Sequence, residues 1–252
     1  MNNNNSNNHF IIVAPLSAIS TRTRLFKLTK FLISERKVYV THFAWERVLG
    51  ESDEKGVFDI KKRILLRGGG YGNTKIKLLY FIWMIKVFLS SFFIKKNTKV
   101  WALGFESAFP LLLASKIIGF KIYFDDADRF SMLFNFPKPF LHLIQLLEKF
   151  TSQHVYLHII PVKERYHFES SKFHILLNFP SETEILKGRE IFKIQKRMYI
   201  KAQIVINING WLGSGRGMDT ALKLANKMKD ENIAFILAGK LDCEEASKLS
   251  LM

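Results

Sequence analysis

A glycine-rich segment around residue 210 has the residue types of a phosphate-binding loop. It follows the apolar run 204–208 and has four glycines within eight residues, namely Gly210, Gly213, Gly215 and Gly217. Glycine lets the backbone pass close to a ligand, and the N–H groups that open a following helix attract phosphate oxygens. Arg216 adds a guanidinium with two donors for a diphosphate. The segment predicts a buried strand, a phosphate-binding turn and then a helix, unless the glycines only bend the chain and Arg216 lies in solvent.

A second candidate site is the acidic run Asp125-Asp126-Ala127-Asp128, which directly follows the apolar residues 122–124. Asp126 and Asp128 form a D-x-D pattern, and their oxygens suit a hard divalent cation. The alternative is a turn at the end of a strand, in which these carboxylates cap the next segment. The pattern therefore leaves metal binding and capping both open.

Two cations form a third candidate site, in the loop after the first predicted strand. Arg22 and Arg24 alternate with hydroxyl residues at the expected start of a helix. They could bind an anionic group, although solvation at the surface explains them equally well. The histidines of the chain are scattered without metal-ligand spacing, so no metal site is expected from them.

Short apolar runs alternate with helical patterns along residues 10–177, which indicates a parallel sheet covered on both faces. The expected strands are 10–14, 38–42, 63–66, 100–103, 121–124, 155–160 and 173–177, and the expected helices are 21–32, 75–94, 108–118 and 141–150. The pattern breaks at 178–180, and a second α/β unit begins near residue 202. We therefore expect a disordered Asn-rich tail at 1–9, one domain at 10–180, a linker at 181–201 and an incomplete second domain at 202–252.

The charge of the chain is concentrated in its first part. The net charge is +16, and residues 201–252 carry seven Lys/Arg against six Asp/Glu, which leaves about +15 for residues 1–200. The basic residues are interleaved with Phe, Trp and Tyr, and no nucleic-acid-binding motif is present, so an anionic membrane surface is the expected partner. A solvated basic surface is the alternative. The apolar stretch 78–94 contains Lys86, which favours a core or surface-docking helix over a membrane span.

Three stretches, taken in their order along the chain, resemble the retaining glycosyltransferases of family four, also called glycosyl transferases group 1. Residues 120–131 are similar to the strand and acidic turn that close the acceptor domain of those enzymes. Residues 176–180 resemble the stretch before their interdomain linker, and residues 210–219 resemble the segment that opens their donor domain. The resemblance implies an α/β, GT-B-like fold, with a Rossmann-like N-terminal domain and the start of a second Rossmann-like domain.

The resemblance also implies roles for the candidate residues. Arg216-Gly217 matches the Lys-Gly pair whose cation holds the donor diphosphate, so Gly210, Gly215, Arg216 and Gly217 are expected to bind phosphate. Asp126 or Asp128 is expected to orient the acceptor hydroxyl or the donor sugar. Asp128 is preferred because Arg129 could pair with it and fix its direction. Arg22 and Arg24 are expected on the acceptor side, where they could meet a lipid diphosphate.

The chain departs from the family pattern at two places. Trp211 stands where those enzymes usually have a second phosphate-binding arginine. Their Glu-x7-Glu donor segment is absent after residue 204, and Glu182 and Glu190, which have this spacing, precede the predicted donor sheet. Whether the chain is an enzyme is therefore left open. One alternative is a truncated, non-catalytic, membrane-associated remnant, and another is a metal-dependent GT-A transferase that uses Asp126 and Asp128.

The function implied by the resemblance is transfer of a sugar from a nucleotide-sugar to a lipid-linked or polysaccharide acceptor in cell-surface polysaccharide biosynthesis. No cofactor or metal is expected, because in such enzymes electrostatic stabilisation of the departing diphosphate does much of the chemistry. The expected location is cytoplasmic, peripheral at the inner face of an anionic membrane, with no nucleic-acid partner.

Overall fold

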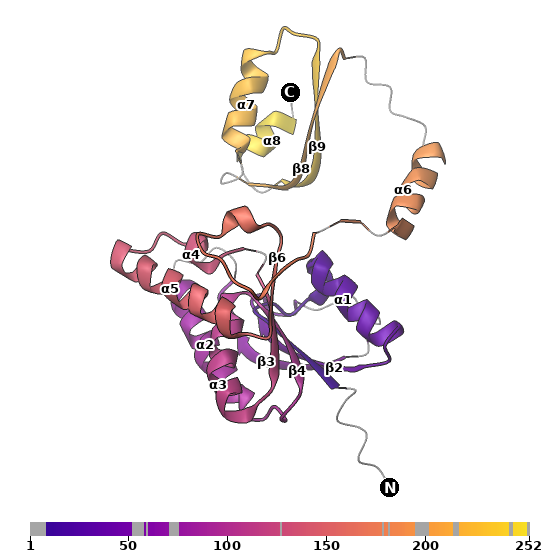
Figure 1. Cartoon of the computed structure of the whole chain (residues 1–252). Coiled ribbons are helices and arrows are strands. Elements are labelled where there is room, and N and C mark those ends of the chain that lie inside the picture. The colour runs from indigo at the N-terminus through magenta and orange to yellow at the C-terminus, as the bar shows by residue number, and fades with distance from the viewer. Residues whose placement is uncertain are drawn as a thin grey trace. The chain divides into compact units, whose positions relative to one another are not determined.

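The computed structural model describes residues 9–51, 58, 60–70, 76–126, 128–177, 179–180, 182–194, 202–213, 217–241 and 244–250. The chain divides into two compact units, Met1–Phe179 and Pro180–Met252 (Figure 1).

The first unit is built on a seven-stranded sheet in the order β3-β2-β1-β4-β5-β6-β7, and every neighbouring pair in it is parallel. Its strands are β1 His9–Ala14, β2 Tyr39–Glu46, β3 Lys61–Arg67, β4 Lys99–Leu103, β5 Lys121–Asp125, β6 Leu157–Ile160 and β7 Phe173–Ile175. The α/β class and the parallel sheet predicted from the sequence are confirmed. Strand β2 runs four residues beyond the predicted end at His42, because Phe43-Ala44-Trp45 continues the pairing with β3.

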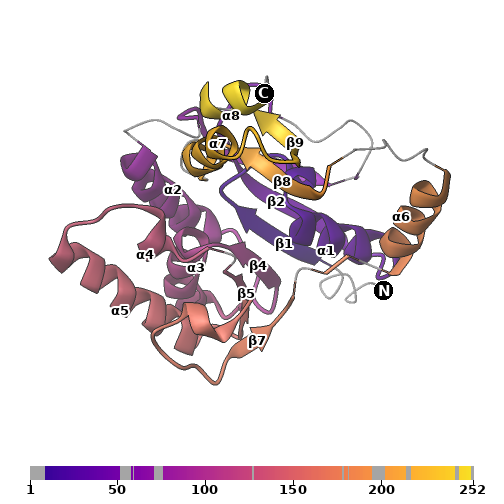
Figure 2. The ribbon, with the colours of Figure 1, turned by 90° about the horizontal axis from the view of Figure 1, so that it is seen from above.

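Helices cover both faces of this sheet. They are α1 Thr23–Ser34, α2 Ile76–Ser91, α3 Phe105–Ile118, α4 Phe130–Leu133 and α5 Lys138–His154, with the 3-10 turns η2 Ile19–Thr21 and η3 Lys163–Arg165. Helix α1 packs on one face, whereas α2, α3 and α5 form a layer on the other (Figure 2). Residues of β1 alternate between the faces, since Ile11 and Val13 belong to the core under α2 and α3 while Phe10 and Ile12 belong to the core under α1. Within the described residues, no helix is both long enough and apolar enough to cross a membrane.

The strand order creates a switch point between β1 and β4. Both strands lie in the middle of the sheet and pair in register from Phe10–Lys99 to Val13–Ala102. The chain leaves β1 toward β2 on one side and leaves β4 toward β5 on the other. In open parallel sheets, ligands bind beyond the carboxyl ends of the strands at this point. The carboxyl edge of the sheet is therefore where functional side chains are expected.

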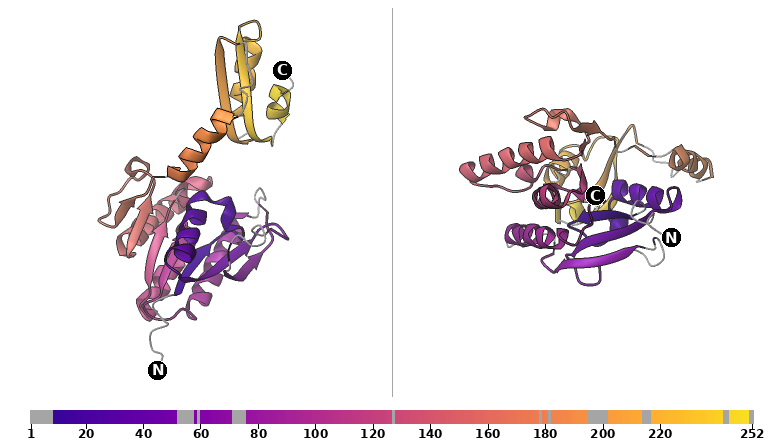
Figure 3. Two further views of the ribbon diagram at one scale, coloured as in Figure 1. Left: turned by 90° about the vertical axis from the view of Figure 1, so that its right-hand side faces the viewer. Right: turned by 60° about the horizontal axis from the view of Figure 1, so that its bottom comes forward.

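The second unit contains α6 Glu182–Ile194, β8 Ile204–Leu212, α7 Met218–Lys227, β9 Ile233–Leu241 and α8 Glu244–Ser250. Strands β8 and β9 form a parallel pair, and α7 and α8 lie on one side of it (Figure 3). The stretch 181–201, expected as a linker, includes the helix α6. Strand β8 is not the buried strand that the sequence predicted, because Ile204 is 52% and Val205 is 45% exposed. This apolar run is exposed because the sheet described here contains two strands, β8 and β9. The core of the unit consists of Leu212, Met218, Ala225, Ala246 and Leu249.

We expect Gly239→Ala to destabilise the second unit. Gly239 pairs with Gly210 and has φ of 150°, and a Cβ at Gly239 would fall onto the carbonyl oxygen of Gly210. Forcing these strands apart costs about 1–3 kcal/mol, which hydrogen exchange of the β8 and β9 amides would report as a lower opening free energy. The control is Gly188→Ala in α6, where nothing lies near the new Cβ and helix propensity favours alanine. Unchanged protection of β8 and β9 in Gly239→Ala would contradict the close approach.

Candidate functional site

Four buried carboxyl groups mark the candidate site on the first unit. Asp125 ends β5 and Asp126 follows it, Glu106 lies in the first turn of α3 after β4, and Glu148 lies on α5. Three of the four thus come from the segments that leave the carboxyl ends of β4 and β5. A buried carboxylate is stable only with a countercharge, hydrogen-bond donors or a proton. The partners of each group therefore define the site.

Arg24 forms an ion pair with Asp125, whose side chain is fully buried. Trp101 Nε1 donates a second hydrogen bond to Asp125 over 3.2 Å, and Arg24 also donates to the carbonyl oxygen of Leu176 over 3.1 Å. Burial raises the pKa of Asp125, and the charge and hydrogen bond of Arg24 oppose that rise. Arg24 was predicted to bind an anionic group on the acceptor side, but its guanidinium is already paired with the buried Asp125 carboxylate. Arg22 is exposed at the N-cap of α1.

Asp126 accepts a hydrogen bond from a tyrosine and lies near a histidine. Tyr166 donates its hydroxyl proton to Asp126 Oδ2 over 2.8 Å, and His158 Nε2 lies 3.7 Å from the same oxygen. The His158 ring stacks on Phe124 at 4.1 Å between centroids, and its Nδ1 lies 2.7 Å from Ser152 Oγ. Among the described residues, Asp126 Oδ1 is buried with no hydrogen-bond partner. Burial, followed by the negative charge of Asp126, raises the pKa of Tyr166, so this hydroxyl stays protonated.

Asp128 differs from Asp126, because its side chain is 61% exposed and lies 3.7 Å from Arg165. The expected pair between Asp128 and Arg129 is therefore wrong. Arg129 is buried and donates to Glu148 over 3.1 Å instead. The physical reason is burial, since Glu148 needs a countercharge inside the protein whereas water solvates Asp128. The backbone and hydroxyl groups of Ser131 complete the shell of Glu148.

Glu106, Arg47 and Tyr80 form a part of the site that the sequence motifs did not indicate. Arg47 directly follows β2, donates to the carbonyl oxygen of Pro15 over 2.8 Å and to the Tyr80 hydroxyl over 2.6 Å, and stacks 4.4 Å from the Trp45 ring centroid. The Glu106 carboxyl lies against Gly104, where a Cβ would come within 2.6 Å of Oε2 and where φ is 77°. Burial raises the pKa of Glu106 to about 7, against the opposing effects of its own backbone N–H and Arg47. The one sequence signal is a Gly-x-Glu at the end of a predicted strand.

The predicted phosphate-binding residues lie in the second unit. Gly210 is within β8 with φ of 111°, rather than in the turn after the strand. Gly217 is the N-cap of α7 with φ of 80°, and nothing lies near the position of a Cβ there. Gly215 and Arg216 lie outside the described residues. Gly217 is therefore the predicted residue that the structure places at a helix N-terminus.

A pocket of about 290 Å³ lies beside the acidic cluster. Tyr166, which holds Asp126, is one of its walls, and the others are Lys163, His167, Phe168, Glu169 and Phe173. No group of three or more His, Cys, Asp or Glu side chains that could hold a metal ion occurs among the described residues. Asp126 and Asp128 also have different partners and very different exposure, so they do not form the shared ligand pair that the D-x-D pattern predicts.

Comparison with known proteins supports the fold. No family model and no curated protein matches the chain. Among solved structures, sucrose-phosphate synthase from Thermosynechococcus elongatus aligns with 96% of this chain and 72% of its own, with TM-score 0.58 and 8% identity. The E. coli trehalose-6-phosphate protein bound with UDP-2-fluoro glucose aligns with 96% and 68%, with TM-score 0.51 and 9% identity. S. aureus MnaA with UDP reaches TM-score 0.48, with 11% identity over 96% of this chain and 65% of that one.

At these identities the likeness concerns the fold. The chain has the Rossmann-like α/β architecture of GT-B proteins, as the sequence predicted. It spans about two thirds of the length of the solved proteins that it matches. The GT-A alternative is therefore wrong at the level of the fold, because the parallel sheet and its helices align with those of GT-B proteins.

Replacing Glu106 with glutamine should flatten the pH dependence of stability. The pKa of this carboxyl rises from 4.5 in a free chain to about 7 in the fold. The folded state therefore binds this proton more tightly than the unfolded chain does. The resulting stabilisation of the fold is fully present below pH 4.5 and is lost as the pH rises through 7. Between these limits the free energy of unfolding of the wild type should fall by up to about 3 kcal/mol. Glutamine does not titrate, so Glu106→Gln should not show this decrease.

Urea unfolding at a series of pH values measures this difference. Glu35→Gln, at the exposed C-terminal end of α1, is the control and should follow the wild-type curve. If Glu106→Gln shows the same loss of stability with pH as the wild type, Glu106 does not carry the proton.

Proposed function

We propose that the chain acts in glycosyl transfer and moves a sugar from a nucleotide-sugar to a lipid-linked or polysaccharide acceptor. The observation that carries the proposal is the GT-B-like fold with buried acids at the carboxyl edge of its first sheet. The likeness to sucrose-phosphate synthase and to a protein bound with UDP-2-fluoro glucose supports a nucleotide-sugar donor. The order of the motifs supports the retaining enzymes of family four and a role in cell-surface polysaccharide biosynthesis.

The donor diphosphate is assigned to the start of α7. Gly217 leaves the helix N-terminus open, and the first N–H groups of a helix of this length attract phosphate oxygens. Gly210, Gly215 and Arg216 complete the proposed phosphate-binding set. The bond between the anomeric carbon and the diphosphate oxygen breaks during transfer, so a cation at Arg216 stabilises the leaving group as its charge develops.

The acceptor is assigned to the carboxyl edge of the first unit. Asp128 is exposed and can accept a hydrogen bond from the acceptor hydroxyl, and its carboxylate takes up the hydroxyl proton as the oxygen forms the new bond to the sugar. Asp126 is buried and acts as a positioning residue through Tyr166. Arg22 is the exposed acceptor-side cation of our proposal, whereas Arg24 acts by fixing Asp125.

The proposed place of action is the cytoplasmic face of the inner membrane, where the protein is peripheral. The excess of about 15 positive charges over residues 1–200 favours an anionic surface. A lipid-linked acceptor would be presented at that surface, so an enzyme held there meets its substrate in two dimensions rather than three. The positive charge of the first part of the chain and the proposed lipid-linked acceptor therefore both favour the membrane surface.

Asp128→Asn and Asp126→Asn should both reduce transfer. Radiolabelled nucleotide-sugars are offered to the full chain with membrane lipid, and transfer into lipid or polymer is counted. Loss of a group that contacts the acceptor costs about 10²–10⁴-fold in rate, and we expect Asp128→Asn in this range with donor binding unchanged. Asp230→Asn, on an exposed turn of the second unit, is the control. Absence of both transfer and nucleotide binding for every donor would overturn the proposal and favour a non-catalytic membrane-associated protein.

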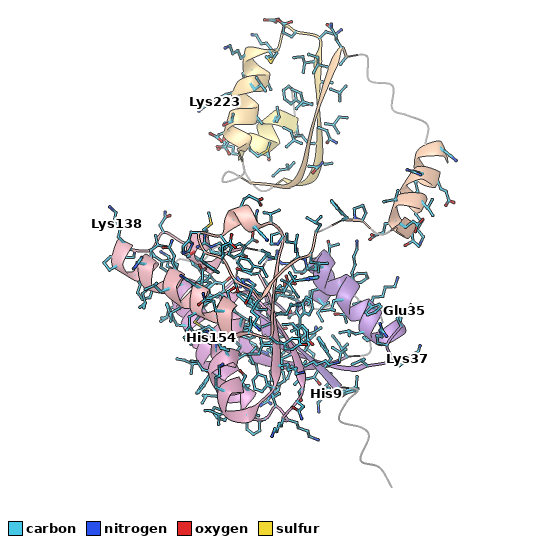
Figure 4. The ribbon with its side chains drawn as sticks, in the orientation of Figure 1. His9, Glu35, Lys37, Lys138, His154 and Lys223 are labelled. Atoms are coloured by element: carbon cyan, nitrogen blue, oxygen red, sulfur yellow. The ribbon has the colours of Figure 1, made fainter. Side chains whose placement is uncertain are left out.

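Arg216→Ala should weaken binding of a nucleoside diphosphate. One charge-assisted hydrogen bond contributes about 1.5–3 kcal/mol, which corresponds to about 10- to 100-fold in Kd, and calorimetry with UDP and GDP measures it. Lys223→Ala removes an exposed charge from α7 (Figure 4) and should leave Kd nearly unchanged. Equal effects of the two variants would mean that general charge, rather than the glycine-rich turn, binds the diphosphate.

A further inference from the structure

The helical layer α2–α3–α5 exposes apolar side chains that a soluble surface would normally avoid. On α2, Leu78, Phe81, Ile85 and Leu89 recur at spacings of three and four residues, so they form one stripe along the helix, and all four are exposed. Leu78 is 62% and Ile85 is 59% exposed. The stripe faces away from the sheet, because Trp83 and Val87 on the opposite side of α2 are fully buried in the core.

The apolar surface continues across the other two helices. Ile117 on α3 is 73% exposed, and Leu143 and Leu146 on α5 are about half exposed. Phe81 of α2 and Phe140 of α5 contact each other with ring centroids 6.0 Å apart. Helices α2, α3 and α5 lie together on the side of the sheet opposite α1 (Figure 2). Their outer surface is thus one extended apolar face rather than scattered exposed residues.

The charges on this face have one sign. The five lysines of these helices, Lys77, Lys86, Lys116, Lys138 and Lys149, are all exposed, whereas the carboxyl groups of Glu106 on α3 and Glu148 on α5 are buried, as are those of Asp125 and Asp126. The remaining carboxylate, Asp128, lies beside Arg165. Lys138 extends from the start of α5 away from the sheet (Figure 4). The exposed surface of these helices therefore offers long cationic side chains around apolar ones.

We propose that the outer face of α2, α3 and α5 docks on an anionic lipid bilayer. A bilayer interface accepts both features at once, since apolar side chains enter the acyl boundary while lysines reach the anionic headgroups. Nucleic acid would satisfy the lysines but leave Leu78, Ile85 and Leu89 in water. A second copy of this chain would bring equal cationic rims together. Charge complementarity thus selects the anionic bilayer.

Aromatic side chains that pack into the core connect the docking face to the candidate site. From Phe140 the aromatic contacts continue through Phe136 and Phe134 to Tyr80, with centroid separations of 5.6, 5.6 and 5.4 Å. The Tyr80 hydroxyl accepts a hydrogen bond from Arg47 at the carboxyl edge. Insofar as the proposed function holds, a lipid-linked acceptor would leave the bilayer beside the site that receives it. The docking itself does not depend on glycosyl transfer.

Flotation of the full chain with vesicles tests the proposal without any nucleotide-sugar. The vesicles contain phosphatidylcholine alone or phosphatidylcholine mixed with phosphatidylglycerol. The wild type should float with the mixed vesicles and bind less as salt is raised. Ile85→Glu combined with Leu89→Glu should lower partitioning at least about tenfold. Phe31→Glu replaces an exposed apolar residue of α1 with glutamate, and it is the matched control for Ile85→Glu alone.

A second variant addresses the charge separately and risks no core packing. Lys116→Glu, Lys138→Glu and Lys149→Glu together should abolish the preference for phosphatidylglycerol, whereas Lys30→Glu, Arg36→Glu and Lys37→Glu on the α1 side should retain most of it. Thermal unfolding checks that each variant is folded. Equal flotation of the wild type and both face variants would overturn the proposal, as would equal loss in the α1 variants.

Other occupants of the face give distinct results. A wild type that ignores both vesicles but forms a dimer by light scattering, dispersed by the Ile85→Glu and Leu89→Glu pair, would assign the face to a second copy. Binding to duplex RNA without binding to vesicles would assign it to nucleic acid. Both outcomes overturn bilayer docking. Because flotation needs no donor, a failure of docking is distinguishable from a failure of the transferase assay.

Discussion

The ion pair between Arg24 and Asp125 is the interaction on which the carboxyl edge of the first sheet depends. Asp125 is fully buried at the end of β5, and Arg24 comes from α1, about a hundred residues earlier in the chain. Trp101 from β4 donates to the same carboxylate, and Arg24 also reaches the carbonyl of Leu176 after β7. One buried charge thus joins α1, β4, β5 and the end of the sheet. Removing either partner would leave an uncompensated charge, which is strongly destabilising.

The neighbouring acids are stabilised by different means, and this difference gives the edge its chemistry. Glu148 has the Arg129 guanidinium and two groups of Ser131, and Asp126 has the Tyr166 hydroxyl. Glu106 lies in a buried position against Gly104, where it holds a proton up to a pH of about 7. The same residue type is therefore stabilised in two ways, by the Arg129 guanidinium at Glu148 and by its own proton at Glu106. Arrangements of this kind supply both hydrogen-bond donors and acceptors near neutral pH.

The sequence predicted the parts of this structure that follow from local pattern. Apolar runs such as 10–14 and 121–124 became β1 and β5, because a strand buried on both faces must be apolar throughout. Partners of buried charges did not follow in the same way. Arg129 lies beside Asp128 in the chain yet pairs with Glu148, since the choice depends on which carboxylate the fold desolvates. Glu106 and Arg47 lie outside any motif, and it is the parallel pairing of β2, β1 and β4 that places the segments after β2 and β4 at one edge.

The order of the strands also decides when the first unit can form. Phe10 in β1 pairs with Lys99 in β4, which is 89 residues further along the chain. Loop closure over such a distance is slow, so contacts of this separation delay folding. While the ribosome is still making β4, β1 lacks one of its two neighbours and α2 lacks the part of the core that α3 later supplies. The nascent chain therefore passes through a stage in which apolar side chains of its first hundred residues are exposed, and such a stage favours aggregation.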